Sequence, residues 1–122
     1  MMGSREKTRT LRETLEAFSR DTNSNEKVQK LIRKWSTTVL IWPEDLDSGF
    51  LLKVENGKIH QIIESTTRED GKVKVIGKSD VITNMFKGKE NLAHLYMDGV
   101  VQTYGSEKDQ IVLDAVARLL WN

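Results

Sequence analysis

The dipeptide Asn56-Gly57 constrains the fold of this chain more than any other local feature. Asn-Gly supplies positive φ at both central positions of a tight turn, and such turns join two antiparallel strands. Apolar residues alternate with other residues from Phe50 to Val54 before the turn, and a second strand-like segment, Lys58 to Glu64, follows it. The sequence therefore predicts a β-hairpin around Asn56-Gly57, with one apolar face.

Three further segments have the composition of strands. Thr37 to Trp42 is rich in β-branched and aromatic residues and ends at Pro43. Asp70-Gly71 predicts another tight turn, which leads into Lys72 to Ile76 with its valines facing inward. These four strands are expected to form an antiparallel meander with one solvated face, and Val100 to Tyr104 is expected to add a fifth.

Apolar residues at helical spacing predict helices around these strands. The expected helices are Arg5 to Arg20, a second ending near Lys34, a short one from Ser79-Asp80 to Gly88, another over about Lys89 to Met97, and a last one capped by Ser106. The fold class is therefore α+β: N-terminal helices and a five-stranded, mainly antiparallel sheet that helices cover on one face.

Length and composition limit the class of protein. A chain of 122 residues fits one domain, expected over residues 1–122 with residues 1–4 disordered. The formal charge of +1 argues against a nucleic-acid partner and allows at most transient membrane contact. The chain has no cysteine, no secretory signal at its start and no apolar run longer than Val39 to Trp42, so we expect a cytoplasmic protein.

No residue pattern argues for catalysis. His60 and His94 lack partners at ligand-like spacing, and a role for either as a proton carrier has no positive support. The acidic residues Glu44, Asp45 and Asp47 lack the spacing of a metal loop and are read as a solvated loop. We therefore expect no enzymatic activity, no catalytic residue, no bound metal and no cofactor.

The order of short glycine-based motifs in the second half of the chain carries a family resemblance. These motifs are Gly77-Lys78-Ser79-Asp80, then Phe86-Lys87-Gly88-Lys89, then Ala93, Gly99, Val101 and Gly105. Together with Gly49-Phe50 and Asn56-Gly57-Lys58 in the first half, they resemble the sterol carrier protein 2 lipid-transfer domain over about residues 5–121.

Three features depart from the family pattern. Glu90-Asn91 stands where a proline is common, the strand from Lys72 to Lys78 is unusually charged, and the chain ends in Trp121-Asn122 without a peroxisomal signal. These departures leave the second short helix, the shape of the tunnel and the identity of the ligand open.

The resemblance implies a hydrophobic tunnel between sheet and helices that accepts a fatty acyl chain, acyl-CoA, sterol or phospholipid. The positions that would line it are Phe50, Leu52, Ile63, Val81, Met85, Phe86, Leu92, Tyr96, Ile111, Val116 and Leu119. Periodicity alone favours plain core packing for the apolar residues of the short helices, so each position would double as core.

The expected function is that of a non-catalytic carrier whose partner is an apolar, lipid-like small molecule. The alternative is a protein-interaction or structural module whose own side chains fill the tunnel. In that case an exposed Trp42 or Trp121 would mark a partner or dimer interface. A homodimer is left open.

Overall fold

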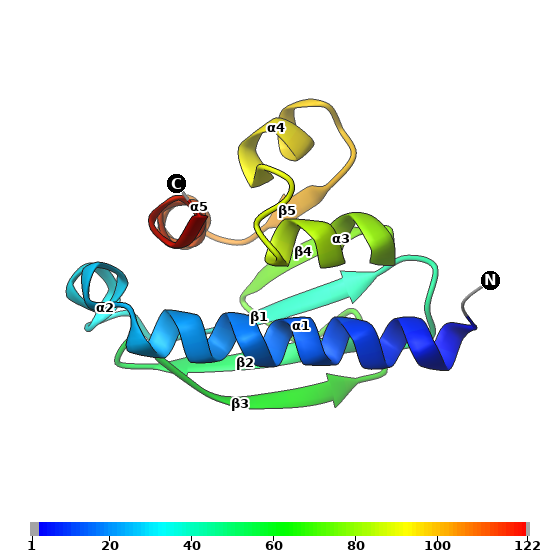
Figure 1. Ribbon diagram of the computed structural model, residues 1–122, viewed down its shortest axis with the longest axis horizontal. Coiled ribbons are helices and arrows are strands. Elements are labelled where there is room, and N and C mark those ends of the chain that lie inside the picture. The colour runs from blue at the N-terminus through cyan, green and yellow to red at the C-terminus, as the bar shows by residue number, and fades with distance from the viewer. Residues whose placement is uncertain (1–2, 122) are drawn as a thin grey trace.

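The computed structural model describes residues 3–121, which form five helices and one five-stranded sheet (Figure 1). In chain order the elements are α1 Ser4–Ser24, α2 Glu26–Ile32, β1 Thr37–Pro43, β2 Gly49–Glu55, β3 Lys58–Ser65, β4 Val73–Gly77, α3 Ser79–Phe86, α4 Leu92–Met97, β5 Gln102–Tyr104 and α5 Glu107–Trp121. Ser4, expected in a disordered start, is the first residue of α1, whereas Met1 and Met2 lie outside the described residues.

The sheet confirms the α+β class and the hairpin. Its strand order is β3-β2-β1-β4-β5, with antiparallel pairing everywhere except between β1 and β4, which are parallel. Asn56 and Gly57 have φ values of 49° and 80°, as the tight turn between β2 and β3 requires. The sheet is thus mixed, and mainly antiparallel.

The expected four-stranded meander is wrong, because Asp70-Gly71 does not form a hairpin turn. Asn56 is the one non-glycine residue with positive φ in the described part of the chain, so Asp70 does not adopt the conformation that such a turn needs. Instead Asp70 Oδ2 accepts a hydrogen bond from Ser65 Oγ at 2.9 Å within a longer connection. Residues 66–72 cross the sheet and deliver β4 to the far side of β1.

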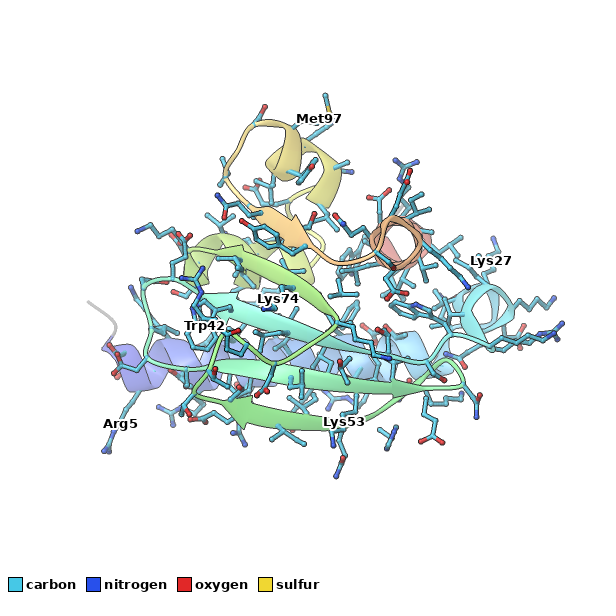
Figure 2. The ribbon with its side chains drawn as sticks, turned by 180° about the vertical axis from the view of Figure 1, so that it is seen from behind. Arg5, Lys27, Trp42, Lys53, Lys74 and Met97 are labelled. Carbon is cyan, nitrogen blue, oxygen red and sulfur yellow. The ribbon has the colours of Figure 1, made fainter. Side chains whose placement is uncertain are left out.

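This crossing connection also covers part of the sheet face that the sequence predicts to be exposed to solvent. Leu40, Trp42 and Ile76 form a second buried cluster there, on the side away from α1, where Trp42 and Lys74 are drawn in Figure 2. Gly71 lies against Leu40, and a Cβ at Gly71 would stand 2.8 Å from that of Leu40. The middle of β1 is therefore covered on both faces.

The helices cover the other face, and the main core lies beneath them. Figure 1 shows α1 running lengthwise across the sheet. Leu11 and Leu15 of α1 are fully buried in the same cluster as Phe50 and Leu52 of β2. Since apolar residues of α1 recur at intervals of three and four, one face of this helix packs on the sheet while its charged face stays in solvent.

Side chains at the α1–α2 corner hold the hairpin in place. Ile59 of β3 exchanges two hydrogen bonds with the Asn23 amide, at 2.8 and 2.9 Å. The Gly57 N–H donates to the Trp35 carbonyl at 2.9 Å, and a Cβ at Gly57 would stand 2.7 Å from the Ile32 carbonyl oxygen. Only glycine allows the turn to approach the end of α2 so closely.

The aromatic side chain of Trp121, near the end of α5, is packed against the other helices. The Trp121 ring lies 5.8 Å from that of Phe18 and 6.4 Å from that of Phe86, between ring centroids. Gly88, which follows α3 with a φ of 78°, makes room for the indole. Trp42 is buried and Trp121 is partly buried, so neither tryptophan is the exposed interface residue that the interaction-module hypothesis expected.

The acidic loop after β1 has a structural role that the sequence did not reveal. The Asp45 carboxylate accepts hydrogen bonds from the backbone N–H and hydroxyl of Ser79, at 2.7 and 2.8 Å, and so caps α3 from a distant segment. Lys7 Nζ lies 3.8 Å away. Partial burial acts to raise the pKa of Asp45, but the Ser79 hydrogen bonds and Lys7 outweigh it and lower the pKa below 3.8.

We predict that Asp45→Asn lowers the free energy of unfolding by about 1 to 2 kcal/mol at neutral pH, because hydrogen bonds to a charged acceptor are lost. The folded-state pKa of Asp45 is depressed, so its stabilisation is present above pH 3.8 and disappears as the pH falls through the folded value. Urea unfolding over this range would measure both effects. The control is Asp47→Asn in the same loop, and an equal loss in both variants would contradict the prediction.

Candidate functional site: a groove between α4, β5 and α5

A groove of about 470 Å³ opens between α4, β5 and α5. Its lining comprises Leu92, Ala93, Tyr96, Thr103, Gly105, Glu107, Gln110, Ile111, Leu113 and Asp114. The volume is within the range of small-molecule sites, about 300 to 1,000 Å³. Leu92 and Leu113 also belong to the main core, so the floor of the groove is continuous with the apolar interior.

One stripe of α5 supplies a wall of the groove. Glu107, Gln110, Ile111 and Asp114 follow the i, i+3, i+4, i+7 spacing that places residues on one helix face. Val116 is buried in the core instead. The helix α5 therefore has two faces, one that lines the groove and one that packs in the core.

Gln110 joins α5 to the edge of the sheet within the groove. Its Oε1 accepts a hydrogen bond from Thr103 Oγ1 at 2.7 Å, and its Nε2 donates to the Gly105 carbonyl at 2.8 Å. Both ends of the amide are thus satisfied by the strand–helix connection. The groove consequently has a fixed polar bridge beside its apolar floor.

Asp109 attaches the start of α5 to the body of the protein. Its Oδ1 accepts a hydrogen bond from Trp35 Nε1 at 2.8 Å, and its Oδ2 accepts one from Thr37 Oγ1 at 3.3 Å. Ser106 Oγ accepts from the Asp109 backbone N–H at 3.1 Å, which confirms the predicted cap. This attachment fixes where the groove face of α5 points.

Large apolar side chains are exposed at and beside the groove. Ile111 and Tyr96, on opposite walls, are 60% and 55% exposed. Met97, which Figure 2 shows at the outer end of α4, is 79% exposed, and Val100 and Tyr104 are also exposed in the segment that follows. Apolar surface concentrated in this way is typical of a binding site.

The residues expected to line a tunnel are separated by the structure into four locations. Leu92, Tyr96 and Ile111 line the groove. Phe50, Leu52, Met85, Phe86 and Val116 are buried in the core between sheet and helices. Val81 and Leu119 are partly buried against that core, and Ile63 lies on the other face of the sheet.

The inward position expected of Ile63 is not found, because the pairing of β2 and β3 is irregular. Its register shifts between Lys53 and Val54, so that Ile59 and Ile62 lie opposite Val54 and Leu52 on the core side. Ile63 then pairs with Leu51 on the other face and is 39% exposed. A bulge of this kind reverses the alternation of faces, so Ile63 does not share the inward face of Ile59.

Sequence reasoning missed most of the groove lining. The missed residues are Ala93, Thr103, Gly105, Glu107, Gln110, Leu113 and Asp114. A signal was present in α5, where the stripe through Ile111 differs from the stripe through Val116 by about 140° at 100° per residue. The sequence analysis predicts both residues to line one tunnel, whereas the structure places them on different faces of α5.

Neither histidine lines the groove. His60 Nε2 lies 3.4 Å from Glu55 Oε2 at the exposed hairpin, and His94 is exposed on α4. Within residues 3–121, no group of three or more His, Cys, Asp or Glu side chains is placed to hold a metal ion. No helix in this described range has both the length and the apolar character needed to cross a membrane.

Comparison with known proteins identifies the fold. No family model matches the chain, and no curated protein matches it in sequence. A solution structure of the sterol carrier protein domain 2 of Helicoverpa armigera matches 97% of this chain and 92% of its own, with a TM-score of 0.73 and 12% identity. The chain has the sterol carrier protein 2 fold.

Two further structures show where this sterol carrier fold occurs. A crystal structure of sterol carrier protein 2 matches 90% of this chain and 95% of its own, with a TM-score of 0.69 and 9% identity. A sec-alkylsulfatase from Pseudomonas sp. matches 77% of this chain over 14% of its own length, with a TM-score of 0.59 and 19% identity. The fold is therefore found both as most of a chain and as a small part of an enzyme.

We predict that Asp109→Ala lowers the free energy of unfolding by about 1 to 3 kcal/mol, since two side-chain donors lose their acceptor. Trp35 emission should change at the same time, because its indole N–H loses the carboxylate. Guanidinium unfolding followed by tryptophan fluorescence measures both. Lys108→Ala, at the exposed neighbouring position, is the control, and a similar loss there would contradict a specific role for Asp109.

Proposed function

We propose that this protein is a non-catalytic carrier that binds an apolar, lipid-like small molecule in the groove between α4, β5 and α5. The observation that carries the proposal is the continuity of the groove with the core. Leu92 and Leu113 belong to both, while Ile111 and Tyr96 are exposed at the opening. A ligand that enters the groove would cover apolar surface that now faces water.

The likeness to sterol carrier protein structures supports this class of ligand. Fatty acyl chains, acyl-CoA, sterols and phospholipids are the ligands that the resemblance suggests. Beyond Leu92 the core contains Met85 and Phe86 on a short helix, and methionine repacks readily around a guest. We propose that a long ligand extends from the groove into this part of the core, which would form the tunnel.

The hydrophobic effect is sufficient for such binding. Burial of about ten CH₂ groups at ~0.8 kcal/mol each would contribute roughly 8 kcal/mol before costs. Association and the ordering of the ligand chain reduce this, so we expect dissociation constants near micromolar or weaker.

We propose that residues 1–122 act as one domain in the cytoplasm. The absence of cysteine from the sequence fits a reducing compartment. The competing hypothesis is an interaction module, with the exposed side chains around Tyr96 and Met97 as its interface. Sedimentation would support that hypothesis if it showed a dimer while no apolar ligand bound.

We predict that Ile111→Asp weakens binding of the uncharged dye Nile red by about tenfold or more, because a charge replaces apolar surface in the groove. Energy transfer from tryptophan to the dye would measure the affinity. Ile111 is already 60% exposed, so the substitution should leave the fold intact, as circular dichroism would verify.

The matched control is Leu31→Asp on α2, where the original side chain is 50% exposed but lies outside the groove. This variant should bind the dye as the parent does. Equal affinities in the parent and Ile111→Asp would locate any binding elsewhere and overturn the proposal, as would failure of the folded parent protein to bind the dye.

A further inference from the structure

The groove has a distinctive charge as well as an apolar floor. Its two charged lining residues within residues 3–121, Glu107 and Asp114, are both acidic. They lie seven residues apart on the same face of α5, which is about 10 Å along the helix axis. A ligand lying over Ile111 would therefore have a carboxylate near each end.

The two carboxylates differ in whether a cationic side chain balances their negative charge. Asp114 Oδ2 lies 3.0 Å from Arg118 Nε, so much of its charge is balanced. Glu107 takes part in none of the salt bridges found among the described residues, and it accepts no side-chain hydrogen bond there. Among the described residues, Glu107 is thus the lining carboxylate without a cationic side-chain partner, at the end of the groove nearest to β5, where the start of α5 offsets part of its charge.

Of the neutral polar side chains in the groove, Gln110 and Thr103 are already satisfied, whereas the Tyr96 hydroxyl takes part in no hydrogen bond among the described residues. The Gln110 amide uses both its oxygen and its nitrogen to bridge Thr103 and Gly105. This leaves the Glu107 carboxylate and the Tyr96 hydroxyl free to meet the head of an amphiphile, and of the two only Glu107 carries a charge. An acceptor without a donor favours a head group that carries N–H donors and positive charge.

We propose that the groove selects its ligand by charge, and that the preferred occupant is a single-chain amphiphile with a protonated amine head group placed at Glu107. The chain lies over Ile111 and Leu92 toward Leu113, and the amine donates to the Glu107 carboxylate. A ligand with a carboxylate or phosphate head of the same chain length is repelled, which would exclude free fatty acids and acyl-CoA from the ligands that the family resemblance suggests. This inference rests on the proposed function, because it assigns a ligand class to the same groove.

Calorimetric titration of the full chain with decylamine, decan-1-ol and decanoate tests the proposal, with the two ionic ligands kept below their micelle concentrations and the alcohol below its solubility limit. At about pH 7 the amine is protonated and the carboxylate is ionised, while the alkyl chain is the same. We expect decylamine to bind about tenfold more tightly than decanoate, with the alcohol between them. The difference should shrink in about 1 M salt, where the Debye length is near 3 Å.

Charge reversal at Glu107 provides the decisive variant. Glu107→Lys should invert the order, so that decanoate binds more tightly than decylamine. The matched control is Asp98→Lys, which makes the same change of charge after α4 but outside the groove lining. This control should keep the order of the parent protein.

The outcomes separate this inference from the proposed function. Equal affinities for the three ligands, or tightest binding of decanoate, would overturn charge selection while leaving the groove a lipid site. An unchanged order in Glu107→Lys would overturn the assignment to Glu107. Failure of Nile red and all three ligands to bind the folded protein would overturn the carrier function and this inference together.

Discussion

The parallel pairing of β1 with β4 is the constraint on which the rest of the structure depends. It places β1 in the middle of the sheet, so its two faces must both be covered. The helices cover the face that contains Val39 and Ile41, and the connection over residues 66–72 crosses the face that contains Leu40. Because the connection takes β4 past β1, the chain continues into α3, α4, β5 and α5 from the β4 side of the sheet. The groove forms there, between α4, β5 and α5.

Cross-connections between distant segments then fix the outer elements on this central strand. Asp45, just after β1, caps α3 through Ser79. Asp109 of α5 receives hydrogen bonds from Trp35 and Thr37, at the other end of β1. Both ends of β1 thus position a helix of the C-terminal half, and in each case a carboxylate is the acceptor. Charge-assisted hydrogen bonds of this kind are among the stronger ones available to a protein without disulfides.

Much of this fold could be predicted from local signals, and the errors have physical causes. The Asn56-Gly57 hairpin, the Ser106 cap and the apolar stripe of α1 all depend on nearby residues, which a sequence displays directly. The partner of β4 depends on a crossing that only tertiary packing decides, so Asp70-Gly71 was misread as a hairpin turn. The residues of the site were harder to predict. A register shift places Ile63 on the other face of the sheet, and its position around the helix places Ile111 in the groove and not in the core. The register shift depends on which strands pair, which the sequence does not display, whereas the different helical phase of Ile111 and Val116 can be read from their spacing.

The small size of α4 has a consequence for how the groove behaves over time. This helix has six residues, and Gly88 and Gly99, both with positive φ, lie in the segments that precede and follow it. Its buried side chains are Leu92 and Leu95, so little apolar burial holds it in place. Local unfolding costs least where few apolar contacts are broken. α4 is therefore the wall of the groove that opens at the least cost, and its opening would set the width of ligand that the proposed site accepts.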